Sequence, residues 1–164
     1  MFTRILVPGD GSPTAGLAGG AAIDLARACG AGIVALSVAV PEAPPWIDGG
    51  MVLDPGQQAD AMHERARGVV DALAGSARRA GIGCIPVTRI APDVARAIVM
   101  AAREYRCDLI VMGSHGRRGL GSSLAGSVTQ EVLAEAPVPV LVLRPARSGK
   151  PARAPRRGGA GDRA

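Results

Sequence analysis

The stretch Arg4-Ile5-Leu6-Val7-Pro8-Gly9-Asp10-Gly11-Ser12-Pro13 decides the fold of this chain. Its first half is a short apolar run, which is typical of a buried strand, and a turn of glycine and aspartate follows it. Ser12 then offers an N-cap with proline at the first helical position, and the apolar spacing that follows predicts a helix ending at Gly30. A strand therefore leads directly into a helix.

The same alternation of strand and helix continues along the chain. Apolar runs predict further strands at 33–40, 85–90, 108–112 and 138–143, and three-to-four spacing predicts helices at 57–80, 92–105 and 127–135. This order predicts an α/β fold, an open, doubly wound, five-stranded parallel sheet with helices on both faces. In such a fold ligands bind beyond the carboxyl ends of the strands, where the winding reverses. The turns after the first and fourth strands meet there if those strands are neighbours.

Composition predicts one domain at residues 1–145 and a basic tail at residues 146–164. The net charge of +5 belongs to this tail, which is rich in Gly, Pro and Ala and lacks the large hydrophobic residues that ordering requires. We therefore expect the tail to be disordered and the folded part to be neutral. The chain has one Phe, one Trp and one Tyr, too few to stack nucleic-acid bases, so we expect no specific nucleic-acid partner.

The sequence indicates neither membrane insertion nor secretion. No apolar run nears the roughly 18 residues of a spanning helix, and the first residues lack a signal-peptide pattern, so we expect a cytoplasmic protein without a membrane partner. Cys29, Cys84 and Cys107 are far apart and odd in number, which favours small buried residues over a disulfide framework or a zinc site. Segment 41–56 is long and rich in proline, so we expect an irregular loop of unassigned role.

A glycine-rich motif follows the fourth strand. Met112-Gly113-Ser114-His115-Gly116 is followed, nine residues after Gly116, by Gly126-Ser127-Val128-Thr129. Glycine lets the backbone approach an anion, and the start of a helix offers unpaired N–H groups and the positive end of its dipole. The motif therefore predicts a phosphate cradle, and we expect the chain to bind a nucleotide.

Two parts of the chain resemble the universal stress protein family. The turn Val7-Pro8-Gly9-Asp10-Gly11-Ser12 resembles the family's Val-Pro-x-Asp-Gly-Ser, and the glycine motif is similar to its nucleotide motif G-x2-G-x9-G-(S/T). The likeness covers residues 2–145 and includes the apolar strand that ends the domain. The chain departs from the family pattern at Gly9, where a branched apolar residue is common, and at Ile90-Ala91-Pro92, where Gly-x-Pro is usual.

The resemblance to ATP-binding members implies a site for an adenine nucleotide. The turn after the first strand would lie against the adenosine, the backbone that ends the second strand would meet the adenine, and the fourth strand with its loop would cover ribose and phosphates. The implied site residues are Pro8, Asp10, Val38, Met112, Gly113, Gly116, Gly126, Ser127, Val128 and Thr129. The last four would offer N–H and hydroxyl donors to the phosphates of ATP, and Mg²⁺ or Mn²⁺ would be held mainly by phosphate oxygens and water.

The resemblance also implies a homodimer through the edge of the strand at 138–143, in which Val138 is the first residue and Leu143 the last. Such an apolar edge would otherwise invite uncontrolled pairing. The function that the sequence favours is a nucleotide-dependent switch in a stress response, with slow or no hydrolysis and an unknown protein partner. Two alternatives stay open, namely a dimeric interaction module that works without ATP, and a weak ATPase.

Strong catalysis is not expected from this sequence. The chain lacks the Gly-x-x-x-x-Gly-Lys-(Ser/Thr) loop, and its only lysine, Lys150, lies in the tail. His115 has no carboxylate or third orienting residue at motif spacing, so we expect it to serve the loop and predict no catalytic residue. A receiver site is excluded because the turns after the strands lack the acid cluster and the lysine it needs, and Thr14 breaks the dinucleotide pattern begun by Gly9 and Gly11.

Overall fold

The computed structural model describes residues 1–41, 55–114 and 126–144. The expectations for Gly116, for most of the loop at 41–56 and for the basic tail lie outside these residues. The described elements are, in chain order, β1 (Arg4–Pro8), α1 (Pro13–Cys29), β2 (Gly32–Ala39), α2 (Pro55–Arg79), β3 (Cys84–Ile90), α3 (Val94–Glu104), β4 (Leu109–Gly113), α4 (Ser127–Glu135) and β5 (Val140–Leu143).

The five strands form one parallel sheet in the order β3-β2-β1-β4-β5. β1 pairs with β2 on one side and with β4 on the other, so the adjacency of the first and fourth strands is confirmed. The chain winds from β1 towards β3 and then returns to the opposite side of β1, so the winding reverses between β1 and β4. The expected doubly wound α/β fold is therefore confirmed, and its switch point lies at the carboxyl ends of these two strands.

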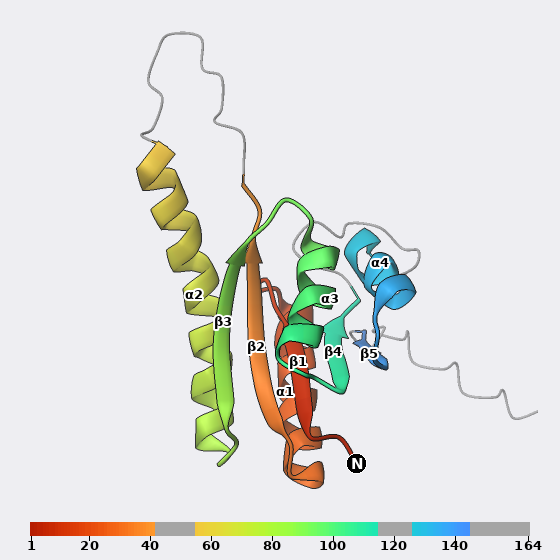
Figure 1. Cartoon of the computed structure of the whole chain (residues 1–164). Coiled ribbons are helices and arrows are strands. Elements are labelled where there is room, and N and C mark those ends of the chain that lie inside the picture. Colours follow the sequence, from red (N-terminus) through yellow and green to blue (C-terminus); the bar gives the residue numbers. More distant parts are fainter. Residues whose placement is uncertain (42–54, 115–125, 145–164) are drawn as a thin grey trace, which may run out of the picture.

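The helices cover both faces of the sheet (Figure 1). Side chains alternate along β1, so Ile5 and Val7 enter the core beneath α1 and α2, whereas Leu6 enters the core beneath α3 and α4. All three side chains are buried almost completely. Burial on both faces explains why the strands are continuous apolar runs without polar alternation.

The carboxylate of Asp108 links β1 to β4 at the end of the sheet opposite the switch point. The side chain of Asp108 accepts hydrogen bonds from the backbone N–H groups of Thr3 and Arg4 and from the Thr3 hydroxyl, at 2.7–3.0 Å. Burial alone raises the pKa of this carboxyl, but the hydrogen bonds outweigh it and lower the pKa below its ordinary value. These hydrogen bonds hold the N-terminal end of β1 beside the N-terminal end of β4.

Several predicted boundaries were wrong, each for a local reason. α2 begins at Pro55, inside the segment predicted as loop, because proline is compatible with the first turn of a helix. β5 begins at Val140 and not at Val138 because Pro139 has no N–H, although its carbonyl accepts from the Ile110 N–H. Of the cysteines, Cys107 is buried as expected, whereas Cys29 and Cys84 are half-buried. Among the described residues no helix is long and apolar enough to cross a membrane.

Candidate functional site

A pocket of about 530 Å³ opens at the carboxyl ends of the strands, at the switch point. Its volume falls within the range of small-molecule sites, roughly 300–1,000 Å³. The wall is built from the β1–α1 turn, the end of β2, one side of α2, the N-terminal part of α3, the end of β4 and the start of α4. Elements far apart in the sequence therefore converge on one cavity.

The predicted site residues that the structure describes all line this pocket. They are Pro8, Asp10, Val38, Met112, Gly113, Gly126, Ser127, Val128 and Thr129. Gly116, the tenth predicted residue, lies outside the described part of the chain. The structure thus brings the predicted residues together, and their contact with a nucleotide stays a prediction.

The β1–α1 turn shapes the floor of the pocket. Asp10 accepts a hydrogen bond from the Ser12 N–H at 2.9 Å, and Ser12 in turn accepts from the Ala15 N–H at 3.2 Å as the N-cap of α1. Gly11 has a φ of 81°, a left-handed conformation that glycine adopts without strain. These contacts fix the first turn of α1 and hold Asp10 at the pocket, where it also serves the turn.

Gly113 permits a close approach between β4 and α1. A Cβ at this position would lie 2.8 Å from Cγ2 of Thr14 and 3.0 Å from the carbonyl carbon and oxygen of Thr14. The space beside Gly113 is therefore already occupied by backbone of α1. A bulky residue at Gly113 would therefore disturb the packing of α1 against β4.

The start of α4 faces the pocket with only some of its donors available. The N-cap of α4 is Gly126, and no side chain caps the helix. The Gly126 N–H donates to the Ser114 carbonyl at 2.7 Å, and the buried Thr129 hydroxyl donates to the Gly113 carbonyl at 3.2 Å. These two groups tie α4 to β4, so neither can donate to a phosphate at the same time.

The donors that remain for an anion are those at the exposed end of α4. The backbone N–H groups of Ser127 and Val128 belong to the first turn and have no intrahelical acceptor. The Ser127 hydroxyl is exposed beside them. The Gly126 N–H and the Thr129 hydroxyl are therefore used within the fold, whereas donation to a phosphate by the Ser127 and Val128 N–H groups and the Ser127 hydroxyl stays a prediction.

Sequence reasoning missed the walls that α2 and α3 contribute. Met62, Arg65 and Ala66 line the pocket from α2, and Val94 and Ile98 line it from α3. No local pattern identifies Arg65, because an exposed arginine on a helix has the same pattern whether it faces a ligand or only water. Among the described lining residues, Asp10 and Arg65 are the charged ones. No group of three or more His, Cys, Asp or Glu that could hold a metal ion occurs in the part of the chain that the structure describes.

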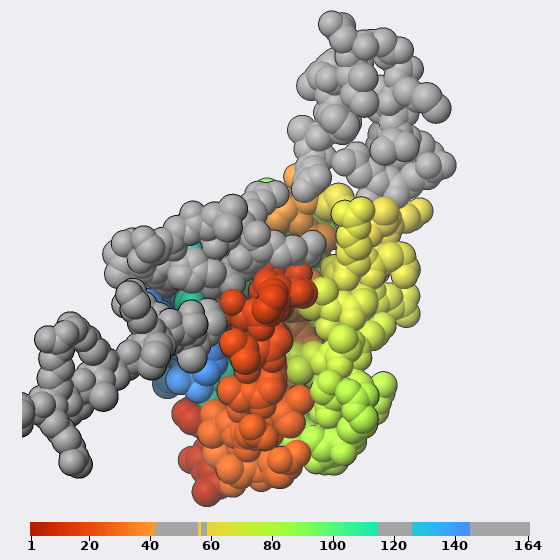
Figure 2. Space-filling view, turned by 180° about the vertical axis from the view of Figure 1, so that it is seen from behind, coloured from red at the N-terminus to blue at the C-terminus, as the bar shows by residue number. Residues whose placement is uncertain are grey.

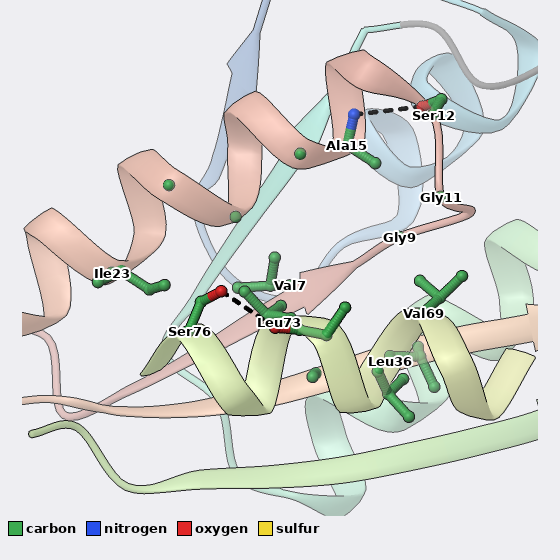
Figure 3. Close-up of a pocket in the computed structure, with 16 residues that line it drawn as sticks. Val7, Gly9, Gly11, Ser12, Ala15, Ile23, Leu36, Val69, Leu73 and Ser76 are labelled. Atoms are coloured by element: carbon green, nitrogen blue, oxygen red, sulfur yellow. Dashed lines mark hydrogen bonds between the residues drawn. The ribbon is translucent and has the colours of Figure 1, made fainter. Parts of the chain in front are cut away.

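A second hollow lies between α1 and α2, which run side by side in Figure 2. It measures about 330 Å³ and is lined mainly by glycine and apolar side chains, among them Gly9, Val69 and Leu73 (Figure 3). Its two hydroxyls are used within their own segments, since Ser12 accepts from Ala15 and Ser76 donates to the Ala72 carbonyl. It presents no convergent polar groups for a ligand, so the larger pocket is the candidate site.

Comparison with known proteins gives a family for the whole described domain. The model of the universal stress protein family matches residues 1–144. A universal stress protein of Thermus aquaticus is 33% identical over 144 residues, covering 88% of this chain and all of that protein. A crystal structure of a universal stress protein family member from Burkholderia pseudomallei matches with a TM-score of 0.70 and 34% identity, covering 86% of this chain and 95% of that one.

Other relatives differ in length or bear ligands. A universal stress protein of Mycobacterium tuberculosis is 35% identical over 85% of this chain, but the match covers only 45% of that protein, so this chain spans about half its length. Two more distant structures share the fold, one from Archaeoglobus fulgidus in complex with dAMP (TM-score 0.62, 21% identity) and one from Arabidopsis thaliana with AMP bound (TM-score 0.61, 17% identity).

Proposed function

The chain belongs to the universal stress protein family, and from this premise we propose that it binds an adenine nucleotide, ATP in particular. It acts as a cytoplasmic regulatory protein of the stress response, a switch whose hydrolysis of ATP is slow or absent. One observation carries the proposal, namely that those residues implied by the family resemblance which the structure describes line a single pocket at the switch point of the sheet. The nucleotides bound to the Archaeoglobus and Arabidopsis proteins support it from outside the chain.

The two ends of the pocket suit the two ends of a nucleotide. At the β2 end Val38, Val40 and Met62 line the pocket with apolar side chains against which a base can pack. At the α4 end the Ser127 and Val128 N–H groups and the Ser127 hydroxyl offer donors to a phosphate, and the helix dipole favours its negative charge. We assign the base to the first end and the phosphates to the second.

A divalent cation fits this arrangement only together with the nucleotide. Asp10 is the one carboxylate among the described lining residues, and it already accepts from the Ser12 N–H. Mg²⁺ is commonly held by one or two carboxylates plus substrate phosphates and water. We therefore propose that Mg²⁺ or Mn²⁺ enters bound mainly to the phosphates of ATP.

Replacing Ser127 by glutamate tests the phosphate end without weakening the helix. A carboxylate in the first turn of α4 is favourable to the helix dipole, yet it stands where a phosphate would bind and repels it. The matched control is Gln130→Glu, which adds the same charge one turn later at an exposed position outside the pocket. Calorimetric titration of nucleotide-stripped protein with ATP, with and without Mg²⁺, should give micromolar binding of one ATP per subunit, roughly −8 kcal/mol. Ser127→Glu should weaken it at least tenfold and Gln130→Glu should leave it unchanged.

The same preparation separates the proposed switch from the alternatives. If folded wild-type protein binds no adenine nucleotide, the proposal fails and an interaction module that works without ATP becomes the better account. If ATP binds and is turned over rapidly, the protein is an enzyme and the switch is wrong. Equal binding by wild type and Ser127→Glu would show that the phosphates lie elsewhere.

We also propose a homodimer through the β5 edge of the sheet, at residues 138–143. The Ile110 N–H donates to the Pro139 carbonyl and the Ser114 N–H to the Leu143 carbonyl. The backbone N–H and C=O groups of the odd-numbered residues of β5 therefore point towards β4. The backbone groups of Val140 and Val142 therefore point away from the sheet. On the opposite edge of the sheet, the Gly83 carbonyl and the Ala91 N–H bond to β2, so the backbone groups of odd-numbered residues of β3 point towards β2. Pro86, an even-numbered residue without an N–H, therefore lies on the outer side of β3. Proline protects that edge, and β5 is left as the edge able to pair.

A lysine on β5 tests the dimer. Leu141 is 42% exposed on the β5 edge strand, and Ile85 is 44% exposed on the β3 edge strand, so Leu141→Lys and Ile85→Lys are a matched pair. Light scattering coupled to size-exclusion chromatography should show a dimer for wild type and Ile85→Lys and a monomer for Leu141→Lys. A Leu141→Lys protein that stays dimeric, or a wild type that is monomeric, would contradict this assembly.

A further inference from the structure

Arg65 is the one positively charged side chain among the described residues that line the candidate pocket. It stands on α2, whereas the donors assigned to phosphates stand at the start of α4. The positive charge of Arg65 and the donors proposed for phosphates therefore lie on different helices. The proposed phosphate contacts therefore leave the guanidinium of Arg65 without a role.

The sheet places Arg65 at the nucleoside end. α2 packs on β2 and β3, whereas α4 packs on β5 and α3, and the two helices lie on opposite sides of the fold in Figure 1. A Cβ on Gly9 or Gly11 would contact the Val69 side chain at 3.5 or 3.2 Å, which locates Val69 over the β1–α1 turn. Arg65 lies one helical turn before Val69, and α2 runs antiparallel to the strands, so Arg65 lies further out, past their carboxyl ends.

No carboxylate neutralises Arg65 within the described structure. The ion pairs formed by the described residues are Arg27–Asp24 and Arg89–Glu104, neither of which involves Arg65. Its neighbours three and four positions away on α2 are uncharged: Ala61, Met62, Gly68 and Val69. Arg65 is an exposed residue that lines the pocket.

The pocket also offers no aromatic ring to a base. Val38, Val40 and Met62 line the β2 end with apolar side chains, and none of the described residues around the cavity is Phe, Tyr or Trp. Base recognition commonly uses stacking on a flat side chain, and the arginine guanidinium is the flat, cationic alternative to an aromatic ring. Arg65 is the described lining residue with such a group.

We propose that Arg65 binds the nucleoside end of the bound nucleotide, with its guanidinium plane against the base. This inference rests on the proposed nucleotide binding. It predicts that affinity for adenosine depends on Arg65 as strongly as affinity for ATP does, and that affinity for the bare triphosphate does not depend on Arg65. Lysine keeps the charge and loses the plane, so it replaces Arg65 only partly.

The test compares three ligands and three variants. Adenosine, ATP with Mg²⁺ and inorganic tripolyphosphate with Mg²⁺ are titrated into nucleotide-stripped full-length wild type, Arg65→Ala, Arg65→Lys and the control Arg67→Ala. Arg67 is exposed on the same helix but does not line the pocket. For Arg65→Ala we expect adenosine and ATP to bind about tenfold more weakly and tripolyphosphate to bind as in wild type. Arg65→Lys should recover part of the loss, and Arg67→Ala should match wild type for every ligand.

Each other outcome overturns the proposal in a distinct way. If tripolyphosphate binding weakens with ATP binding while adenosine binding stays the same, Arg65 contacts phosphate. If Arg65→Ala and Arg67→Ala both match wild type, Arg65 is a solvated surface residue. If wild type binds none of the three ligands, nucleotide binding itself fails and the role of Arg65 fails with it. Thermal unfolding of each variant by circular dichroism separates a loss of contact from a loss of fold.

Discussion

Alanine at Gly113 should destabilise the domain even though the change adds one methyl group. The added Cβ would lie 2.8 Å from Cγ2 of Thr14 and 3.0 Å from two of its backbone atoms. Rotating the Thr14 side chain relieves only the first contact, so the first turn of α1 must move away from β4. Overpacking of a close-packed interior costs roughly 1–3 kcal/mol. With a urea m-value of about 2 kcal/mol per molar, the unfolding midpoint should fall by about 1 M.

Gly20→Ala is the control for this prediction. Gly20 lies in the middle of α1, and a Cβ there would meet no atom within 4 Å. Because glycine in a helix interior is less stable than alanine by roughly 0.5–1 kcal/mol, this variant should unfold at a higher urea concentration than wild type. The measurement is urea unfolding followed by circular dichroism. A Gly113→Ala midpoint equal to or above that of wild type would refute the argument from the Thr14 contact.

The stability of Gly113→Ala also affects the interpretation of ATP binding by Gly113 variants. If Gly113→Ala shifts α1, it shifts the β1–α1 turn that carries Asp10, because Ser12 caps that helix. Loss of ATP binding by a Gly113 variant would then report a displaced turn and not a lost phosphate contact. Ser127→Glu avoids this ambiguity, since its charge is favourable to the helix that bears it.

Two further predictions concern ionisable groups away from the pocket. Asp108→Asn should cost about 1–2 kcal/mol in urea unfolding at pH 6, because it removes the charge that accepts from Thr3 and Arg4. Although burial raises the pKa of Asp108, its hydrogen bonds lower it on balance, so its contribution is present above the unfolded-state pKa and is lost as pH falls through the folded value. The difference between wild type and variant should therefore shrink below about pH 4, and a constant difference down to acid unfolding would contradict this. Burial raises the pKa of the Cys107 thiol to about 11 despite the nearby Arg4, so iodoacetamide at pH 8 should modify half-buried Cys29 well before Cys107, as followed by mass spectrometry. Equal rates for the two thiols in native protein would rule out this account.

The order and type of the elements could be predicted because burial leaves a strong pattern in the sequence. A strand such as β1, with Ile5 and Leu6 buried on opposite faces, must be apolar throughout, and a helix covering one face must be apolar on one side. The boundaries were less predictable because they depend on single backbone groups. Pro139 shows this, since its side chain fits the apolar run while its missing N–H delays the start of β5.

The pocket was only partly predictable for a different reason. The glycine motif identifies donors by local backbone geometry, but it does not show which donors are used by tertiary contacts, as the Gly126 N–H and the Thr129 hydroxyl are. Arg65 was missed because an exposed arginine on a helix has the same local pattern whether it faces a ligand or only water. Its position at the cavity depends on how α2 packs against β2, which no local pattern contains.

Ser114 joins the two surfaces on which the proposals depend. Its N–H donates to the Leu143 carbonyl at the end of β5, and its carbonyl accepts from the Gly126 N–H at the start of α4. Ser114 is therefore a single residue whose backbone hydrogen bonds connect the proposed dimer edge to the helix that carries the proposed phosphate donors. Because Ser114 is completely buried, displacing it for either surface would break bonds to the other. A nucleotide that pulled on the start of α4 would thus act on β5 through Ser114, which gives a switch of this kind a short physical route from ligand to partner.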